Sequence, residues 1–187
     1  MKRLQRASIL LTLNEELRKA GSWAGETHMQ KATYFLQGLM DVRLEFEFIL
    51  YKHGPFSFDL RDELTFMRAQ GFLRLEPQYP YGPSLVGGEK SKLLKVVFEK
   101  TIEEQLPTIR FVAQKIGNKR VAELERTATA LYIRLQEPSD TDRVKRLIGL
   151  KPHIDLPEAQ AAVSEVEQIV REYSSMRPTK RRIGLAG

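Results

Sequence analysis

The stretch YKHGPFSFDL, residues 51–60, places the strongest local constraint on how this 187-residue chain folds. Pro55 fixes its own φ at about −65° and restricts Gly54 to extended or turn geometry. Ser57 then stands where a side-chain oxygen accepts hydrogen bonds from the free N–H groups of a helix that begins at Phe58. The stretch therefore predicts a joint between an extended segment and a helix, without any catalytic role.

Apolar periodicity predicts two helices and one strand before this joint. Apolar residues recur at helical spacing over residues 3–20, and Gly21 stands where a helix commonly ends. A second helix is predicted over residues 28–40, with Thr27 as its N-cap. Residues 42–51 alternate apolar and charged side chains, which predicts an extended strand with one exposed face.

The segments after the joint predict a helix and a β-hairpin. The helix runs over residues 58–70 to a glycine, and FLRLEP, residues 72–77, follows as a short strand. A segment rich in turn residues, 78–91, then separates it from the apolar run LLKVVF, residues 93–98. The order helix, helix, strand, helix, strand, strand over residues 1–98 is that of a winged helix, with the hairpin as its wing.

The remaining sequence predicts helices only, which start at residues 107, 119, 141 and 157. The expected fold class is therefore mostly α (α+β): a winged-helix-like amino-terminal domain with a small β-hairpin wing, and a carboxy-terminal helical extension. The expected boundaries are 1–100 for the winged-helix-like domain, 101–176 for the extension and 177–187 for a basic, flexible tail.

The net charge of +6 is concentrated near the end of the chain. Residues 177–182, RPTKRR, contribute four positive charges, which leaves +2 for the rest. A basic tail of this kind is either a solvated end or a contact for nucleic acid or another anionic partner. The chain contains no cysteine, so disulfides, thiol catalysis and cysteine-bound metals are excluded. The apolar run near the N-terminus is too short for a signal peptide or a membrane span, and we expect a soluble, cytoplasmic protein.

No catalytic or metal-binding motif stands out. The three histidines are far apart in sequence, and no His-Glu-x-x-His, Gly-x-Ser-x-Gly or phosphate-loop pattern occurs. The Gly87-Gly88 loop lacks the spacing of a phosphate loop, and a hairpin turn is the better interpretation. His53 could act as a general base, but a lone loop histidine is more often structural. We therefore predict no catalytic residue, no metal and no cofactor.

The second predicted helix carries a polar and aromatic stripe formed by Gln30, Lys31, Tyr34 and Gln37. One interpretation is a solvated face with a half-buried tyrosine. The other is a surface that binds a protein partner, because a tyrosine flanked by amides combines a rigid ring with a hydrogen-bonding tip. We take the stripe as the candidate partner-binding site.

Nucleic-acid binding is the alternative function. The would-be recognition helix, residues 58–70, has a net charge of −1, which is unfavourable near phosphates. The expected wing is only mildly basic. The candidate nucleic-acid contacts are the wing lysines and the basic residues of the tail: Lys90, Lys92, Lys95, Arg177, Lys180, Arg181 and Arg182.

Several segments resemble a known family. MQKATYFLQGL (29–39) followed by YKHGPFSFDLRDELTFMRAQGFL (51–73) resembles the YwgA-like proteins of bacteria and archaea and, more distantly, the Panacea domain of SocA-like antitoxins. ELERTATALYIR (123–134) and LKPHIDLPEAQAAVSEV (150–166) resemble the carboxy-terminal helices of the YwgA-like group. His53 replaces a tyrosine that is common before Gly-Pro, and Met29 replaces a leucine.

This resemblance implies a role in protein interaction. The YwgA-like proteins have no established activity and supply no catalytic residues, whereas the Panacea resemblance implies neutralisation of a partner toxin. The expected function is a non-enzymatic binding or regulatory protein that acts on a protein partner, such as a toxin or a defence component. The alternative is a DNA-binding winged-helix regulator that uses the wing and the basic tail.

Overall fold

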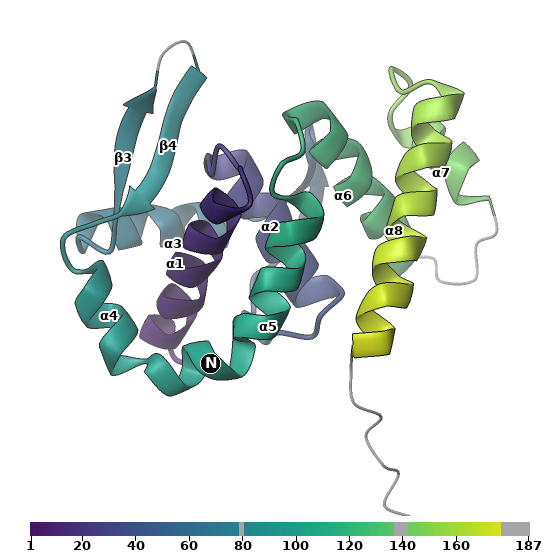
Figure 1. Cartoon of the computed structure of the whole chain (residues 1–187). Coiled ribbons are helices and arrows are strands. Elements are labelled where there is room, and N and C mark those ends of the chain that lie inside the picture. The colour runs from purple at the N-terminus through teal and green to yellow at the C-terminus, as the bar shows by residue number, and fades with distance from the viewer. Residues whose placement is uncertain (79–80, 137–141, 177–187) are drawn as a thin grey trace, which may run out of the picture.

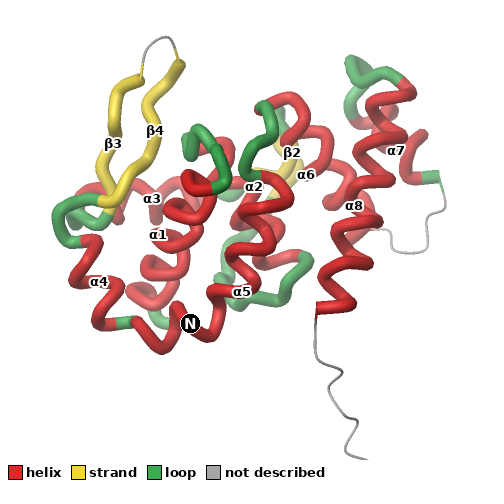
Figure 2. The backbone as a smooth tube through the Cα atoms, in the orientation of Figure 1, coloured by secondary structure: helices red, strands yellow, loops and turns green. Residues whose placement is uncertain are grey.

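The computed structural model describes residues 1–78, 81–136 and 142–176 (Figure 1). Over these ranges the fold is mostly helical, with two small antiparallel sheets of two strands each (Figure 2). The helices are α1 (Arg3–Lys19), α2 (Glu26–Gly38), α3 (Phe58–Ala69), α4 (Ser91–Val97), α5 (Glu99–Ile116), α6 (Val121–Gln136), α7 (Arg143–Leu150) and α8 (Leu156–Met176). The strands are β1 (Ile49–Tyr51), β2 (Gly54–Phe56), β3 (Leu73–Gln78) and β4 (Tyr81–Gly87).

The helices surround one hydrophobic cluster. α1 packs along α5, α2 packs on α5 and α6, and α6 packs on α7 and α8. In Figure 1 the β3–β4 hairpin projects from one end of the molecule, and α7 and α8 lie at the other. The domain boundary expected at residue 100 falls inside α5, and the cluster includes residues from both sides of it. None of the helices in the described ranges has the length and apolar character needed to cross a membrane.

The joint predicted at the opening stretch is present. Ser57 has extended backbone geometry, and its Oγ accepts a hydrogen bond from the Leu60 N–H at 3.2 Å, which makes it the N-cap of α3. Gly54 and Pro55 belong to strand β2 together with Phe56. This strand pairs with β1 across a two-residue turn. Gly54 has φ +84°, and a Cβ there would lie 3.0 Å from the Thr129 hydroxyl of α6, so the turn requires glycine.

Replacing Ser57 with alanine should lower the free energy of unfolding by about 1 kcal/mol, the usual cost of removing an N-cap side chain. Urea denaturation monitored by circular dichroism measures this change. His53→Ala is the comparison, and it should cost less because the His53 side chain is 65% exposed. The reverse order of the two effects would show that the N-cap assignment is wrong.

The prediction of a strand over residues 42–51 is wrong for all but its last three residues. The alternation of buried and exposed side chains is present from Val42 to Glu47, but no strand lies beside this segment in the described structure. Asp41 and Glu45 have positive φ, which breaks the extended geometry. The alternation of apolar and charged residues therefore indicates that one face of the segment is buried, and does not indicate that the segment belongs to a sheet.

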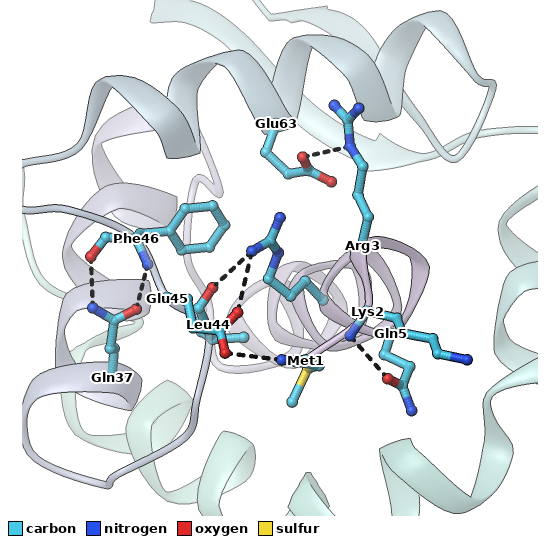
Figure 3. Close-up of polar contacts among 10 residues, drawn as sticks. Met1, Lys2, Arg3, Gln5, Gln37, Leu44, Glu45, Phe46 and Glu63 are labelled. Carbon is cyan, nitrogen blue, oxygen red and sulfur yellow. Dashed lines mark hydrogen bonds and ion pairs between the residues drawn. The ribbon is translucent and has the colours of Figure 1, made fainter.

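Side chains replace the missing strand partner along this segment. The Gln37 amide bonds both the N–H and the C=O of Phe46, at 2.8 and 2.7 Å, as a neighbouring strand would (Figure 3). The N-terminal amino group pairs with Glu45 at 2.9 Å, and Arg6 of α1 donates to the Leu44 carbonyl at 3.4 Å. The segment between α2 and β1 is thus held by the N-terminus and by polar side chains from α1 and α2, while Arg3 of α1 pairs with the buried Glu63 of α3 at 2.9 Å (Figure 3).

The predicted hairpin is present after α3, but its second strand was placed wrongly. β3 pairs with β4, which lies in the segment predicted to be a turn. The run LLKVVF, predicted to be a strand, instead forms most of helix α4. Leu94 is its one buried residue, so tertiary contact at that residue overrides the β propensity of two adjacent valines.

Two helices begin earlier than predicted. α2 begins at Glu26, with Gly25 as its N-cap in place of Thr27. α5 begins at Glu99, eight residues before the predicted start, and carries Pro107 in its interior. A proline leaves the carbonyl four residues earlier without its helical donor. Here that carbonyl belongs to Glu103. Because Glu103 and Pro107 are both exposed, water can donate a hydrogen bond to this carbonyl.

Candidate functional site

The stripe predicted to bind a partner lies inside the protein. Gln30, Lys31 and Tyr34 are 1%, 2% and 6% exposed, and Gln37 is half-buried. The prediction of an exposed stripe is therefore wrong, and the interpretation with a half-buried tyrosine understates the burial. The pattern misled because α2 is covered on nearly every side, so its polar residues serve the backbone of neighbouring segments.

Two of these polar residues hold the β1–β2 turn and the joint after it. The Gln30 amide bonds both the N–H and the C=O of Ser57 at 2.9 Å. Lys31 Nζ donates to the Pro55 carbonyl at 2.9 Å. These contacts satisfy backbone groups that no neighbouring strand reaches, which explains why an amide and an ammonium group are buried here.

A buried charge cluster lies beneath the same turn. Glu125 of α6 accepts a hydrogen bond from Lys151 Nζ at 2.8 Å and lies 3.3 Å from His53 Nδ1. Lys151 also donates to the Lys52 carbonyl within the turn. Burial alone would raise the pKa of Glu125, but Lys151 and His53 hold it below its usual value. The cluster fixes the turn against the carboxy-terminal helices.

Burial lowers the pKa of Lys31 to about 8. The nearby Glu125 opposes this shift, and Lys151 adds to it. Between pH 8 and the pKa of a free lysine, the unfolded chain therefore binds more protons than the folded protein. Under that condition the free energy of unfolding rises with pH.

We expect the wild-type protein to gain about 2 kcal/mol of stability relative to a Lys31→Met variant between pH 8 and pH 10. Chemical denaturation of both proteins across this range measures the difference, and the other titrating groups cancel in the comparison. A difference that is independent of pH would show that Lys31 keeps an ordinary pKa in the folded state.

Three adjoining cavities surround the first turn of α2. The largest, about 830 Å³, lies between that turn, the β3–β4 hairpin and the loop from α5 to α6. The second, about 240 Å³, lies between α3 and the hairpin, and the third, about 230 Å³, lies beside the β1–β2 turn. Glu26 lines all three, and Pro83 lines the first two. We call these three adjoining cavities together the α2 groove.

Apolar and aromatic side chains line the largest and the smallest cavity of the α2 groove. Trp23 and Val121 line the largest cavity, and the Trp23 indole N–H is fixed by the Gly82 carbonyl at 3.1 Å. In the smallest cavity, Tyr51 and Phe56 are lining residues, and their ring centroids lie 5.8 Å apart. Tyr51 and Val121 are 54% and 50% exposed, so their apolar surface is available to a partner.

Basic residues outnumber acidic ones along the α2 groove. Glu26 is its one acidic lining residue among those described, whereas its basic lining residues are Lys31, Arg61, Arg68, Lys119 and Arg120. His28 also lines the groove, and its Nε2 lies 3.0 Å from the Lys119 carbonyl. Burial lowers the pKa of His28 in spite of this hydrogen bond, so the ring stays neutral near pH 7.

The residues predicted to contact nucleic acid do not form a wing. Lys90 is the N-cap of α4, and Lys92 and Lys95 lie on that helix, because α4 replaces the predicted strand. Lys95 pairs with Glu15 of α1 at 2.7 Å. The predicted tail contacts, Arg177, Lys180, Arg181 and Arg182, lie outside the described residues.

Within the described ranges, no three histidine, aspartate or glutamate side chains lie together in a group that could hold a metal ion. The α2 groove was missed in the sequence because its residues come from distant segments. Its one visible signal is the single tryptophan, Trp23, in a short connection between two helices.

No protein-family model, no curated protein and no solved structure matches this chain. The resemblance to the YwgA-like and Panacea families thus stays a prediction made from the sequence motifs.

Proposed function

We propose that this chain is a non-enzymatic binding protein whose α2 groove receives an extended segment of another protein. The observation that carries the proposal is that Glu26 lines all three cavities, with exposed apolar side chains in the largest and in the smallest of them. Adjoining shallow cavities with separate anchor side chains are the form of site that takes successive residues of a peptide.

The anchors have the properties of interface hot spots. Hot spots are enriched in tyrosine and tryptophan, whose rings offer large contact areas at a low cost in conformational entropy. Tyr51 lies in a group of rings with Phe56 and Phe58, with centroids 5.1 to 5.9 Å apart. Each ring therefore supports the others before a partner arrives, which reduces the ordering cost of binding.

The proposal also includes a winged-helix-like fold for the amino-terminal half of the chain. The order α1, α2, α3 followed by the hairpin β3–β4 supports a winged-helix-like interpretation of the amino-terminal half. The hairpin contributes Pro83 to the α2 groove, so it would serve as one wall of a protein-binding site. The Panacea resemblance supports a toxin or a defence component as the partner.

Co-purification tests the proposed function. Tyr51→Ala combined with Val121→Ala removes one exposed anchor from the smallest cavity and one from the largest. Leu156→Ala combined with Val96→Ala is the matched control, because these residues are 53% and 73% exposed and do not line the groove. Each protein is recovered from a nuclease-treated extract of the native cells, and bound proteins are quantified by mass spectrometry.

We expect at least one protein to be retained by the wild type and the control and reduced tenfold or more with the groove variant. A tenfold loss corresponds to about 1.4 kcal/mol, which is below the roughly 2 kcal/mol or more that truncating one hot-spot side chain costs. Equal recovery with all three proteins would overturn the proposed function.

A further inference from the structure

We propose that the segment bound in the α2 groove is acidic. This inference rests on the proposed function and specifies the chemistry of the partner. Two carboxylates of the segment pair with Arg68 and Arg120. Its apolar side chains contact Trp23 in the largest cavity and Tyr51 in the smallest.

The first argument is charge complementarity along the groove. Its lining contains several cations and Glu26 as the only described acidic residue. Opposite charge across an interface steers association and disfavours partners of the wrong sign. Lys119 and Arg61 already pair with Glu165 and Asp62, so a basic or neutral segment would leave the positive charges of Arg68 and Arg120 unmatched.

The second argument is that two of the cations are available. Lys119 pairs with Glu165 at 2.6 Å, and Lys31 is buried under the turn. Arg68 and Arg120 are exposed, and neither forms an ion pair with another described residue. Arg68 donates only to the Thr65 hydroxyl, at 3.1 Å. A guanidinium group binds a carboxylate with two parallel hydrogen bonds, which gives directional recognition.

The positions of these arginines set the pattern of the segment. Arg120 lines the largest cavity and Arg68 lines the cavity between α3 and the β3–β4 hairpin, whereas Glu26 lines all three cavities. A carboxylate beside Glu26 would be repelled. The bound segment therefore carries an uncharged residue at that point and an acidic residue on each side of it.

Single-stranded nucleic acid is the competing ligand, because it also favours cations with interspersed aromatic rings. The cavity between α3 and the β3–β4 hairpin argues for a peptide. Its walls include Leu64, Leu75 and Leu85, and it contains no aromatic ring on which a base could stack. A cavity of about 240 Å³ with aliphatic walls suits an aliphatic side chain. A continuous phosphate backbone would also place negative charge next to Glu26.

A displayed library of random 12-residue peptides tests this inference with the full-length protein. Binders are selected on the wild type, sequenced and synthesised with a fluorescein label, and their affinity is measured by fluorescence anisotropy. We expect enrichment of aspartate and glutamate on both sides of an uncharged residue. Arg68→Gln combined with Arg120→Gln should weaken binding of the selected peptides at least tenfold.

The matched control is Lys92→Gln combined with Lys100→Gln, which removes the same charge from exposed positions outside the groove and should change affinity less than twofold. Selected peptides without acidic residues that still depend on Tyr51 and Val121 would overturn this inference and leave the proposed function standing. An absence of peptides that depend on these two anchors would overturn both. Tighter binding of a 12-nucleotide oligo-dT that is lost with the arginine variant would assign the groove to single-stranded nucleic acid.

Discussion

Replacing Glu125 with alanine should lower the free energy of unfolding by about 3–5 kcal/mol, the range found when one partner of a buried ion pair is removed. Glu125 is 8% exposed, and its carboxylate is the nearest counter-charge of the buried Lys151. Lys31 is also drawn to it electrostatically. Without Glu125, two buried ammonium groups remain with backbone carbonyls as their acceptors.

Equilibrium urea denaturation measures this loss. Asp62→Ala is the control, since Asp62 pairs with Arg61 at the surface and is 70% exposed, and it should change stability little. Adding Lys151→Met to Glu125→Ala should recover part of the loss, because one of the two uncompensated charges is then absent. A loss below 1 kcal/mol for Glu125→Ala would show that the cluster beneath the turn contributes little to the fold.

The double variant Tyr34→Ala with Gln37→Ala should lose about 4–6 kcal/mol of stability. Truncating a large buried aromatic residue typically costs 3–5 kcal/mol, and leaving backbone groups without their partner adds about 1 kcal/mol or more. The centroid of the Tyr34 ring lies 5.0 Å from that of Phe48 and 6.4 Å from that of Tyr132. Burial raises the pKa of Tyr34 well above its ordinary value, as expected for a phenol enclosed in the core.

Thermal and urea denaturation measure this effect. Gln114→Ala, at an exposed position on α5, is the control and should leave stability nearly unchanged. Retention of the wild-type thermal midpoint by the double variant would contradict the core position of Tyr34. It would restore the interpretation of α2 as an exposed partner-binding face.

Local sequence signals predicted the elements that local physics controls. The N-cap at Ser57 and the end of α1 followed from side-chain and glycine preferences that act within a few residues. The hairpin after α3 was also expected. These features depend on near neighbours in the chain, so a single sequence contains enough information to place them.

Tertiary contacts decided the features that were missed. The alternation over residues 42–48 predicted a strand, but whether a partner strand exists depends on elements distant in the sequence. In place of a partner strand, the side-chain amide of Gln37 forms hydrogen bonds with the backbone N–H and C=O of Phe46. Likewise, the polar residues of α2 were predicted to be exposed because the helices that pack on α2 are distant in the sequence: α5 begins at Glu99 and α6 at Val121.

The candidate site was the least predictable feature. The α2 groove combines residues from the loop after α1, from α2 and α3, from both hairpins and from the start of α6. No spacing within the sequence connects Trp23 with Arg120 or Tyr51. Their proximity follows only from the packing of α2 against α5 and α6.

Site-specific photo-crosslinking in the native cells tests the central claim most directly, that the α2 groove receives a protein segment. A benzophenone amino acid is placed at Val121 in the groove, at Val96 on the exposed face of α4, or at Leu156 at the start of α8. We predict a discrete protein crosslink from position 121 that disappears when Tyr51→Ala is added, and none from position 156. A crosslink from position 96 without one from position 121 would contradict the account, because it would place the partner on α4.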